Sequence, residues 1–553
     1  MAPIARSWMG AILDRLHTWL NGLPPESNSY TIESLHIPIS SDMNISADLY
    51  QPIGSKPRGT LLIRSPYGIG LMPALGHTRF FAARGYQVLL SSCRGTSGSD
   101  GVLEPGANEV ADGHAVVEWM RKQPWYTGSF ATLGGSYLGY TQWALLTDPP
   151  TDMKAAAIFT GPDSFHEFTW GTGALYSNII TWADLTKKMN AGLGFISMML
   201  HLRSQQTRLA PVFDSAPLLD VVDGHFEGDA PEFLRQTISS PEPKSPYWKT
   251  RDPTGALERA NIPIVLVAGW YDILVREVIE QYLKLTERGC TVALTVGPWT
   301  HLGAQGRNIF DEGLPWFEEH LAGRKHEPRT SPVRIFDTGA GEWRDLPRWP
   351  PQTSPHQLFL DTGGQLSENK PGADSSDSIF KFDPIHPTPA IGARQMFARS
   401  KGKSDEVDAL VSRSDVLCFT TEVLEHDLEV CGRPSVQLFH SSNHPHVDLL
   451  AVLSEVDMNG ISRSISERYL RLDPDREASP LHLGLHDCAH TFRTGTRIRL
   501  LLAGGSHPRY IRNLGTGESV ATGAGFRDAW HTIRHNASAA SMLVLPVSVP
   551  DSW

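Results

Sequence analysis

The sequence lacks the cysteine pattern of a disulfide scaffold or a zinc site. Its 553 residues include only 5 cysteines, which are widely spaced and contain no C-x-x-C pair. It also lacks a run of about 18 apolar residues, so we expect no transmembrane helix. These absences predict a cytoplasmic protein with buried thiols and no stable membrane insertion.

Dense runs of lysine and arginine are missing as well. Since the net charge is −11, a polyanionic partner would be repelled, and we expect no binding to nucleic acid. What the chain does have is apolar material, because 40% of its residues are hydrophobic and 15 are tryptophan. Such a long chain predicts several packed domains with aromatic pockets.

The first 28 residues contain an amphipathic helical pattern. Apolar residues recur every three to four positions, and charged residues interrupt them. The apolar members of this pattern are Ile4, Trp8, Met9, Ile12, Leu13, Leu16, Trp19 and Leu20. We expect this helix to pack on its own domain, with a membrane-surface or partner-docking role as the alternative.

Short apolar strands alternate with helices in the first half of the chain, which is typical of a parallel sheet covered on both faces. Strands are predicted at 60–64, 86–90, 130–133, 263–268 and 291–296, and helices at 108–122 and 275–288. A segment rich in Trp, Phe and Met interrupts this rhythm, and short strands with Gly/Pro turns follow beyond about residue 330. The predicted domains are an N-terminal extension (1–28), an α/β core (29–155 and 251–328), a helical cap (156–250) and a β jelly roll (329–553).

The most informative motif surrounds one serine. Gly134-Gly-Ser-Tyr-Leu-Gly139 follows a predicted strand, and its glycines permit the tight strand-to-helix turn that projects a nucleophilic hydroxyl. The usual pattern is G-x-S-x-G, whereas here the second glycine comes one residue later. We predict Ser136 as the nucleophile, the alternative being an ordinary Gly/Ser turn.

Two further residues follow predicted strands in the order that a catalytic triad requires. Asp272 ends Gly-Trp-Tyr-Asp after the strand 263–268, and His301 ends Gly-Pro-Trp-Thr-His after the strand 291–296. A serine needs a base, and that base needs an acceptor to hold it, so the chain order Ser, Asp, His indicates acyl transfer. Taken singly, Asp272 could cap a helix and His301 could be structural.

The oxyanion of such a reaction needs hydrogen-bond donors. One is the backbone N–H of Tyr137, directly after the nucleophile, and Tyr67 in the turn Ser65-Pro-Tyr-Gly68 is the candidate for the second. The alternative for Tyr67 is a plain turn residue. Aromatic residues that we expect to line a substrate pocket, unless they belong to the core, are Trp170, Trp270, Tyr271 and Trp299.

A histidine-rich stretch, from His440 to Asp448, has the residue types of a metal site. Pro445 stiffens it as a turn between two predicted strands, and Ser-His-Asp chemistry requires no metal. We therefore expect no metal and no other cofactor.

Together these motifs resemble the CocE/NonD family of serine acyl hydrolases, in the superfamily of cocaine esterase, α-amino acid ester hydrolases and X-Pro dipeptidyl-peptidases. The resemblance implies an α/β-hydrolase core with an inserted cap and a C-terminal jelly roll, and it implies that the Tyr67 hydroxyl lies beside the Tyr137 amide in the oxyanion hole. The motifs that carry it, in family order, are Arg64-Ser-Pro-Tyr67, Arg94 to Gly101, Gln123-Pro-Trp125, Gly134 to Gly139, Gly269-Trp-Tyr-Asp272 and Gly297-Pro-Trp-Thr-His301.

We predict a serine hydrolase that cleaves a carboxylic ester, or an amide or lactone, of a small-molecule acyl substrate through an acyl-enzyme. Its triad is Ser136, His301 and Asp272. The alternatives are an acyltransferase or cyclase on the same triad, an X-Pro dipeptidyl-peptidase, and a non-catalytic protein that binds through its jelly roll. The cap is the segment least like the family, and no amine-binding carboxylate is identified from the sequence. A homo-oligomer is left open.

Overall fold

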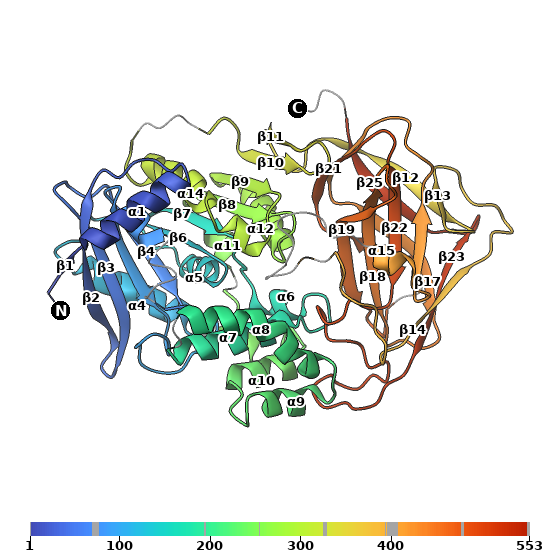
Figure 1. Cartoon of the computed structure of the whole chain (residues 1–553), viewed down its shortest axis with the longest axis horizontal. Helices are drawn as coiled ribbons and strands as arrows, with labels where there is room; N and C mark the ends of the chain where they lie inside the picture. Colours follow the sequence, from blue (N-terminus) through green and yellow to red (C-terminus); the bar gives the residue numbers. More distant parts are fainter. Residues whose placement is uncertain are drawn as a thin grey trace.

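The chain forms an α/β domain, a group of cap helices and a β domain. The computed structural model describes residues 2–68, 77–192, 195–253, 255–324, 329–392, 394, 408–476 and 480–549. In Figure 1 the α/β domain lies at the left, the cap helices lie below it, and the β domain lies at the right. Among these residues, no helix combines the length and the apolar character needed to cross a membrane.

An eleven-stranded sheet, counted over the described residues, forms the centre of the α/β domain, in the order β1-β2-β3-β5-β4-β6-β7-β8-β9-β10-β11. From β5 to β10 neighbouring strands are parallel, while β1, β2, β3 and β11 pair antiparallel at the two edges. The strands are β1 (Ile4–Ala5), β2 (Ser29–Ser40), β3 (Met43–Ile53), β4 (Thr60–Ser65), β5 (Gln87–Ser92), β6 (Phe130–Gly135), β7 (Met153–Phe159), β8 (Ile264–Gly269), β9 (Val292–Gly297), β10 (Val333–Asp337) and β11 (Glu342–Leu346).

Helices cover both faces of this sheet. Successive residues of a strand point to opposite sides, so each strand contributes side chains to the hydrophobic cores on both faces. In β4, Leu62 joins one hydrophobic core, whereas Leu61 and Ile63 join the other. The first core is covered by α4 (Glu109–Arg121), α5 (Tyr137–Leu145), α11 (Ala256–Arg259) and α12 (Val275–Glu287), and the second by α3 (Arg79–Ala82) and α14 (Asn308–His320). The apolar strands predicted from the sequence are thus buried on both sides, as a parallel sheet requires.

The cap differs from its expected boundary. Residue 156, its predicted start, lies inside β7, whose alanine-rich sequence resembles a helix but pairs in parallel with β6 and β8. The helical segment begins only at Phe165. Its helices are α6 (Phe165–Trp170), α7 (Asn178–Asn190), α8 (Phe195–Phe213), α9 (Leu218–His225), α10 (Glu232–Ser239) and the short η2 (Trp248–Thr250).

The boundary predicted at residue 329 also shifts. Two strands beyond it, β10 and β11, extend the first sheet, because Val333 pairs in parallel with Leu294 of β9. The jelly-roll domain then encloses its own apolar core. Its elements are β12 (Thr353–Asp361), β13 (Gln365–Ser367), β14 (Ser378–Phe382), α15 (Asp408–Val411), β15 (Val416–Thr420), β16 (Leu428–Gly432), β17 (Ser435–Ser442), β18 (Asp448–Val456), β19 (Ser462–Arg471), β20 (Leu481–Gly484), β21 (Cys488–Phe492), β22 (Arg497–Ala503), β23 (Ala529–Asn536), β24 (Ala539–Ala540) and β25 (Met542–Ser548).

The N-terminal helix, α1 (Trp8–Leu20), contacts the α/β domain as expected, but with its polar side rather than its apolar side inward. Its apolar residues do not pack on the α/β domain, and its only buried residue is Gly10. Its contacts with the protein come from the other side of the helix, where Asp14 pairs with Arg79 and the His17 ring meets Phe310. The apolar periodicity therefore predicted the helix correctly, but it did not indicate which face of the helix contacts the protein.

Candidate active site

The predicted nucleophile lies in a strained turn between β6 and α5. Ser136 has φ 58° and ψ −126°, a conformation that is rare for a residue with a side chain. Its backbone N–H donates to the Phe159 carbonyl at 2.9 Å, and its carbonyl accepts from Gly139 and Tyr140 in the first turn of α5. The half-buried serine is thus held at the helix N-terminus, the geometry of a nucleophile elbow.

The late second glycine of the motif has a steric explanation. A Cβ on Gly139 would lie 2.6 Å from the Cα of Gly161, which follows β7. A Cβ on Gly134 would lie 2.4 Å from that of Leu138. Glycine at 139 therefore lets α5 approach the loop after β7, while Leu138 is accommodated because residue 134 lacks a side chain.

The predicted acid and base meet below this turn. Asp272 follows β8 and is fully buried, and His301, the first residue of α13 (His301–Ala304), is 2% exposed. The Nδ1 atom of His301 lies 2.9 Å from Oδ1 of Asp272. The same carboxylate oxygen accepts the backbone N–H of Leu274 at 3.1 Å, which fixes its orientation.

The two predicted oxyanion donors lie beside the serine. Burial raises the pKa of Tyr67, while hydrogen bonding with Trp182, the Ser136 side chain and the Tyr137 backbone opposes that rise. The Tyr67 backbone N–H donates to Oγ of Ser65 at 3.1 Å, which anchors the turn after β4. The Tyr67 hydroxyl therefore lies next to both the Ser136 side chain and the Tyr137 amide.

A buried polar network supports the elbow from beneath. The Tyr137 hydroxyl donates to Oε1 of Glu109 at 2.7 Å, and Oε2 of Glu109 lies 2.7 Å from the Arg64 guanidinium. Burial, followed by the charge of Glu109, raises the pKa of Tyr137 well above its ordinary value, so its hydroxyl keeps its proton. Arg64, in the predicted motif Arg64-Ser-Pro-Tyr67, thus connects the Tyr137 hydroxyl with the segment that carries Tyr67.

The cap contributes a residue that the sequence analysis missed. Trp182, on α7, donates its indole N–H to the Tyr67 hydroxyl at 3.1 Å. Its ring stacks on that of Tyr137, with centroids 5.7 Å apart and planes 6° from parallel. Nothing in the sequence around Trp182 distinguishes it from the other cap aromatics, since only the folded cap brings α7 over the elbow.

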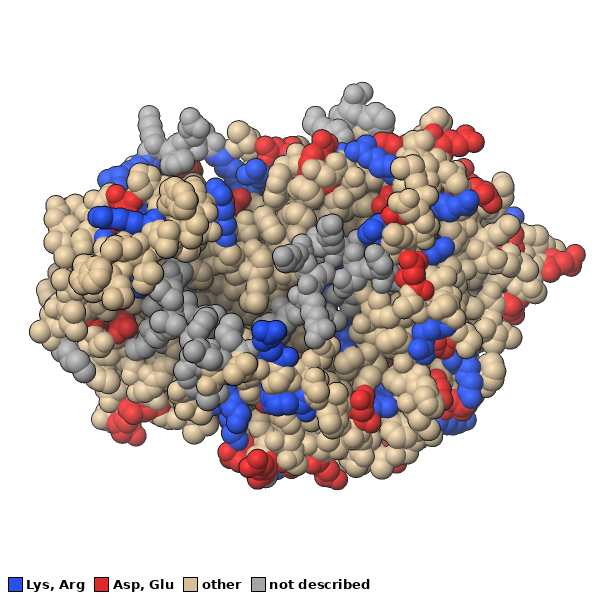
Figure 2. Space-filling view, viewed as in Figure 1, with Lys and Arg blue, Asp and Glu red and all other residues tan. Residues whose placement is uncertain are grey.

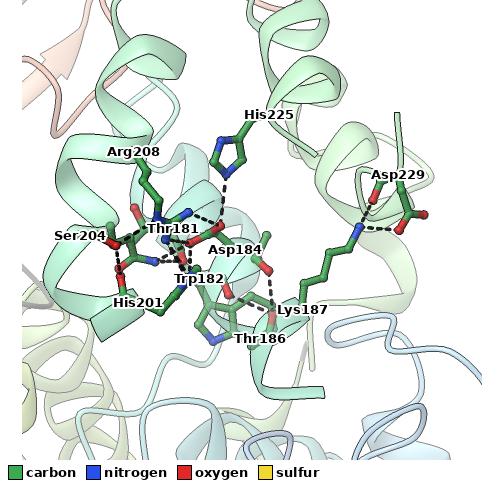
Figure 3. Close-up of polar contacts among 12 residues, drawn as sticks. Thr181, Trp182, Asp184, Thr186, Lys187, His201, Ser204, Arg208, His225 and Asp229 are labelled. Atoms are coloured by element: carbon green, nitrogen blue, oxygen red, sulfur yellow. Dashed lines mark hydrogen bonds and ion pairs between the residues drawn. The ribbon is translucent and has the colours of Figure 1, made fainter. Parts of the chain in front are cut away.

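Two residues beyond Trp182, a buried carboxylate ties three cap helices together (Figure 3). Asp184 of α7 pairs with Arg208 and His201 of α8 at 2.9 and 2.7 Å, and with His225 of α9 at 3.1 Å. Burial favours the neutral acid, but hydrogen bonds from Arg208 and His225 and the nearby charges hold the pKa of Asp184 well below its usual range. This cluster fixes the helix that carries Trp182.

Two of the predicted pocket residues lie in hydrophobic cores, which was the alternative left open for them. Trp170 donates to the Thr237 carbonyl inside the cap core, and Trp270 donates to the Phe336 carbonyl inside the sheet core. Tyr271 and Trp299 are partly exposed on the loops after β8 and β9, where the Tyr271 N–H donates to the Trp299 carbonyl at 3.1 Å. Large aromatics near predicted loops are compatible with core packing, and the burial of Trp170 and Trp270 favours that alternative.

A cavity of about 60 Å³ lies beside the acid of the triad, where core, cap and β domain meet. Its wall includes Ile273 and the charged side chains of Glu167, Glu277 and Arg468. The Oε2 atom of Glu277 has no hydrogen-bond partner within the described residues. Burial, with the charges of nearby carboxylates, raises the pKa of Glu277 well above its ordinary value. The cavity therefore offers carboxyl and guanidinium groups next to the site.

Comparisons with known proteins agree with this architecture. Residues 42–303 match the X-Pro dipeptidyl-peptidase (S15 family) model, and residues 326–544 match the X-Pro dipeptidyl-peptidase C-terminal non-catalytic domain. The chain is 26% identical over 549 residues to a cocaine esterase of Rhodococcus sp. (strain MB1 Bresler), covering 90% of this chain and 94% of that protein.

Two solved structures share the fold over nearly the whole length. An α-amino acid ester hydrolase superimposes with a TM-score of 0.79 at 20% identity, covering 95% of this chain and 98% of its own. A CocE/NonD family hydrolase from Staphylococcus aureus gives a TM-score of 0.67 at 17% identity, with 94% of each chain covered. The fold expected from the sequence, an α/β-hydrolase core with a C-terminal β domain, is thereby confirmed.

Proposed function

The chain belongs to the S15 family of hydrolases, whose catalytic and C-terminal domains it carries in succession, and from this premise we propose that it cleaves carboxylic esters of small molecules through an acyl-enzyme on Ser136. The observation that carries the proposal is the strained elbow at Ser136 together with the buried pair of His301 and Asp272, 2.9 Å apart. A positive φ at a serine is costly and is typical of a functional site.

The pair of His301 and Asp272 determines which imidazole nitrogen can act as the base. With Nδ1–H donating to the carboxylate, the lone pair of Nε2 is left to accept the Ser136 proton. Because Asp272 is fully buried and anchored by the Leu274 N–H, it holds the imidazole in this tautomer. It also stabilises the imidazolium that forms when the proton is transferred.

The reaction then proceeds in two balanced halves. Oγ of Ser136 bonds to the ester carbon while its proton passes to His301, and that proton leaves with the alcohol as the C–O bond breaks. Water repeats the sequence, bonding to the acyl carbon and returning a proton to Ser136 as the acid is released. In both halves the Tyr67 hydroxyl and the Tyr137 amide donate to the oxyanion.

The test is turnover of a short-chain acyl p-nitrophenyl ester, with labelling by a fluorophosphonate as a second measurement. We expect Ser136→Ala to lower kcat/KM by about 10⁴-fold or more and to abolish labelling. Ser55→Ala is the matched control, because Ser55 is exposed in the loop that enters β4, at the opposite end of the strands. Undiminished turnover by Ser136→Ala would remove Ser136 from the mechanism.

One observation favours a second activity, that of an X-Pro dipeptidyl-peptidase. Such an enzyme needs a carboxylate that captures the free amine of its substrate, and Glu167 and Glu277 line the cavity beside Asp272. Arg468 on the same wall opposes a cationic ligand, which is why we rank the ester first. Comparable kcat/KM for an N-terminally free X-Pro p-nitroanilide, lost in Glu277→Gln, would reverse this order.

The remaining alternative, acyl transfer, uses the same acyl-enzyme with a different acceptor. The product mixture distinguishes it from hydrolysis when an alcohol or amine is added to the ester assay. We expect the free acid to remain the main product. Predominant formation of the new ester or amide would indicate that the cap excludes water.

A further inference from the structure

Helix α1 is attached to the protein through its polar side. Asp14 accepts the Tyr30 hydroxyl at 2.8 Å and pairs with Arg79 at 2.8 Å. Arg6, just before the helix, pairs with Glu26 at 3.0 Å, and Arg79 also donates to the Gly10 carbonyl at 2.9 Å. The side chains of Arg6, Asp14 and Glu26 are only 5, 11 and 10% exposed. These contacts settle which face of the helix points inward.

The opposite side presents large apolar side chains to solvent, the reverse of an ordinary surface helix. In Figure 2 the left part of the molecule, where Figure 1 places α1, shows tan surface between scattered charged side chains. The exposed fractions are 74% for Trp8, 57% for Met9, 52% for Ile12, 48% for Leu13, 47% for Leu16, 76% for Trp19 and 65% for Leu20.

The size of this apolar face sets it apart from ordinary surface hydrophobics. At roughly 200 Å² for a large side chain, the seven side chains of the helix, exposed by half to three-quarters, amount to about 800 Å². The largest apolar patch of a typical monomer is about 300–600 Å², whereas a standard interface buries about 800 Å² on each partner. The face thus has the area of a stable protein interface.

Its residue spacing suits another helix. Met9, Ile12, Leu16 and Trp19 follow the 3-4-3 spacing of a two-helix seam. Six of its members are symmetric about position 14, so an antiparallel copy would set Trp8 against Leu20, Met9 against Trp19, and Ile12 against Leu16, while Leu13 would lie opposite Arg15. A patch that matches its own reversed copy is what a two-fold interface requires.

We propose that α1 is a dimerisation helix, which packs antiparallel against α1 of a second copy of this chain around a two-fold axis. A lipid surface fits the observations less well. Helices that lie on membranes hold headgroups with a cationic polar face, whereas here Arg6 and Asp14 are engaged within the protein, and the chain carries a net charge of −11. The proposal is independent of the catalytic assignment.

The molar mass of the full chain in solution tests this by light scattering between about 1 and 100 µM. We expect twice the 61.0 kDa of one chain for the native protein and for Met458→Glu, a control that charges an exposed apolar residue, 81% exposed, in the β domain. Ile12→Glu should be a monomer with unchanged turnover of the p-nitrophenyl ester, since position 12 points away from the protein. A monomeric native chain, or a dimer that survives Ile12→Glu, overturns the proposal.

A second measurement tests the antiparallel register. Leu16→Lys alone should also be monomeric, but an equimolar mixture of Ile12→Glu and Leu16→Lys should recover dimers, because residue 12 of one copy faces residue 16 of the other. Recovery supports the arrangement, and failure to recover contradicts the antiparallel pairing. If the native chain is instead monomeric and sediments with phosphatidylcholine vesicles unless Ile12 is changed to Glu, a lipid surface replaces the second copy as the occupant.

Discussion

The loops after the core strands and the helices of the cap meet at Tyr67, but they contribute to the site in different ways. Ser136, Asp272 and His301 each follow a buried strand of the parallel sheet, so their positions are set by local chain geometry. The cap reaches the site through Trp182, whose position depends on how α7 packs against α8 and α9.

The comparison indicates that the residues proposed to react with the substrate and the residues that position them come from different parts of the structure. The residues that we propose to exchange protons or to contact the oxyanion come from the core, where a substitution would remove a reacting group. The cap residues act through Tyr67 and Tyr137, so a substitution there removes only support. The two regions should therefore respond to mutation with effects of very different size.

The largest difference between core and cap in their effect on turnover is expected from a substitution in the core, at Asp272. Asp272→Asn keeps the shape of the side chain but presents an amide to Nδ1 of His301, which favours the wrong tautomer. We expect kcat to fall by about 10⁴-fold with the fold retained, measured by ester turnover and circular dichroism. A fall of less than about tenfold would mean that another carboxylate orients His301.

Tyr67→Phe should give the next largest effect, because it removes a donor to the oxyanion without changing the ring. We expect a loss of about 10²–10³-fold in kcat with little change in KM. Tyr126→Phe is the matched control, since that hydroxyl donates to Asp152 at 2.6 Å, far from the elbow. Equal rates for the two variants would return Tyr67 to the role of a turn residue.

A much smaller effect is expected from the cap. Trp182→Phe keeps an aromatic ring against Tyr137 but removes the N–H that donates to Tyr67, a single neutral hydrogen bond worth about 0.5–1.5 kcal/mol. We therefore expect kcat to fall by about 2- to 12-fold. Trp170→Phe, which loses an N–H bonded to a carbonyl of the cap core, should leave kcat nearly unchanged. A loss as large as that of Tyr67→Phe would erase the distinction between the regions.

The same contrast explains which parts were predictable from the sequence. Strand periodicity and the glycine turn around Ser136 are local signals, and they indicated the core and the candidate triad. Trp182 and Asp184 carry no local signal, because their partners lie on other helices or in distant loops. The outward orientation of the apolar face of α1 was not predictable for a related reason. Periodicity identifies an apolar face, but only tertiary ion pairs such as that of Asp14 with Arg79 show which face contacts the protein.

The smallest catalytic effect is expected at Asp184, although it is 2% exposed and contacts three charged or ionisable side chains. Asp184→Asn preserves its volume but leaves the Arg208 guanidinium without a counter-charge, so the cap should be destabilised by about 1–3 kcal/mol. Ester turnover at 25 °C should change by less than about twofold, as Trp182 still reaches Tyr67 in the closed cap. Hydrogen exchange in α7 and α8 measures the loosening, with the exposed Asp229→Asn as control.

The pH dependence of that difference identifies the ion pair as its cause. A carboxyl whose folded pKa is depressed contributes stability above its unfolded pKa of about 3.9, and loses it only as the pH falls through the lower folded value. Since its partners hold the pKa of Asp184 well below the usual range, the exchange difference between native and Asp184→Asn proteins should be the same at pH 5 and pH 7. A difference that vanished at pH 5 would contradict the ion pair as its cause, whereas a difference that grew toward pH 5 would show that a neighbouring imidazole gains a proton and pairs with Asp184, His201 being the first candidate.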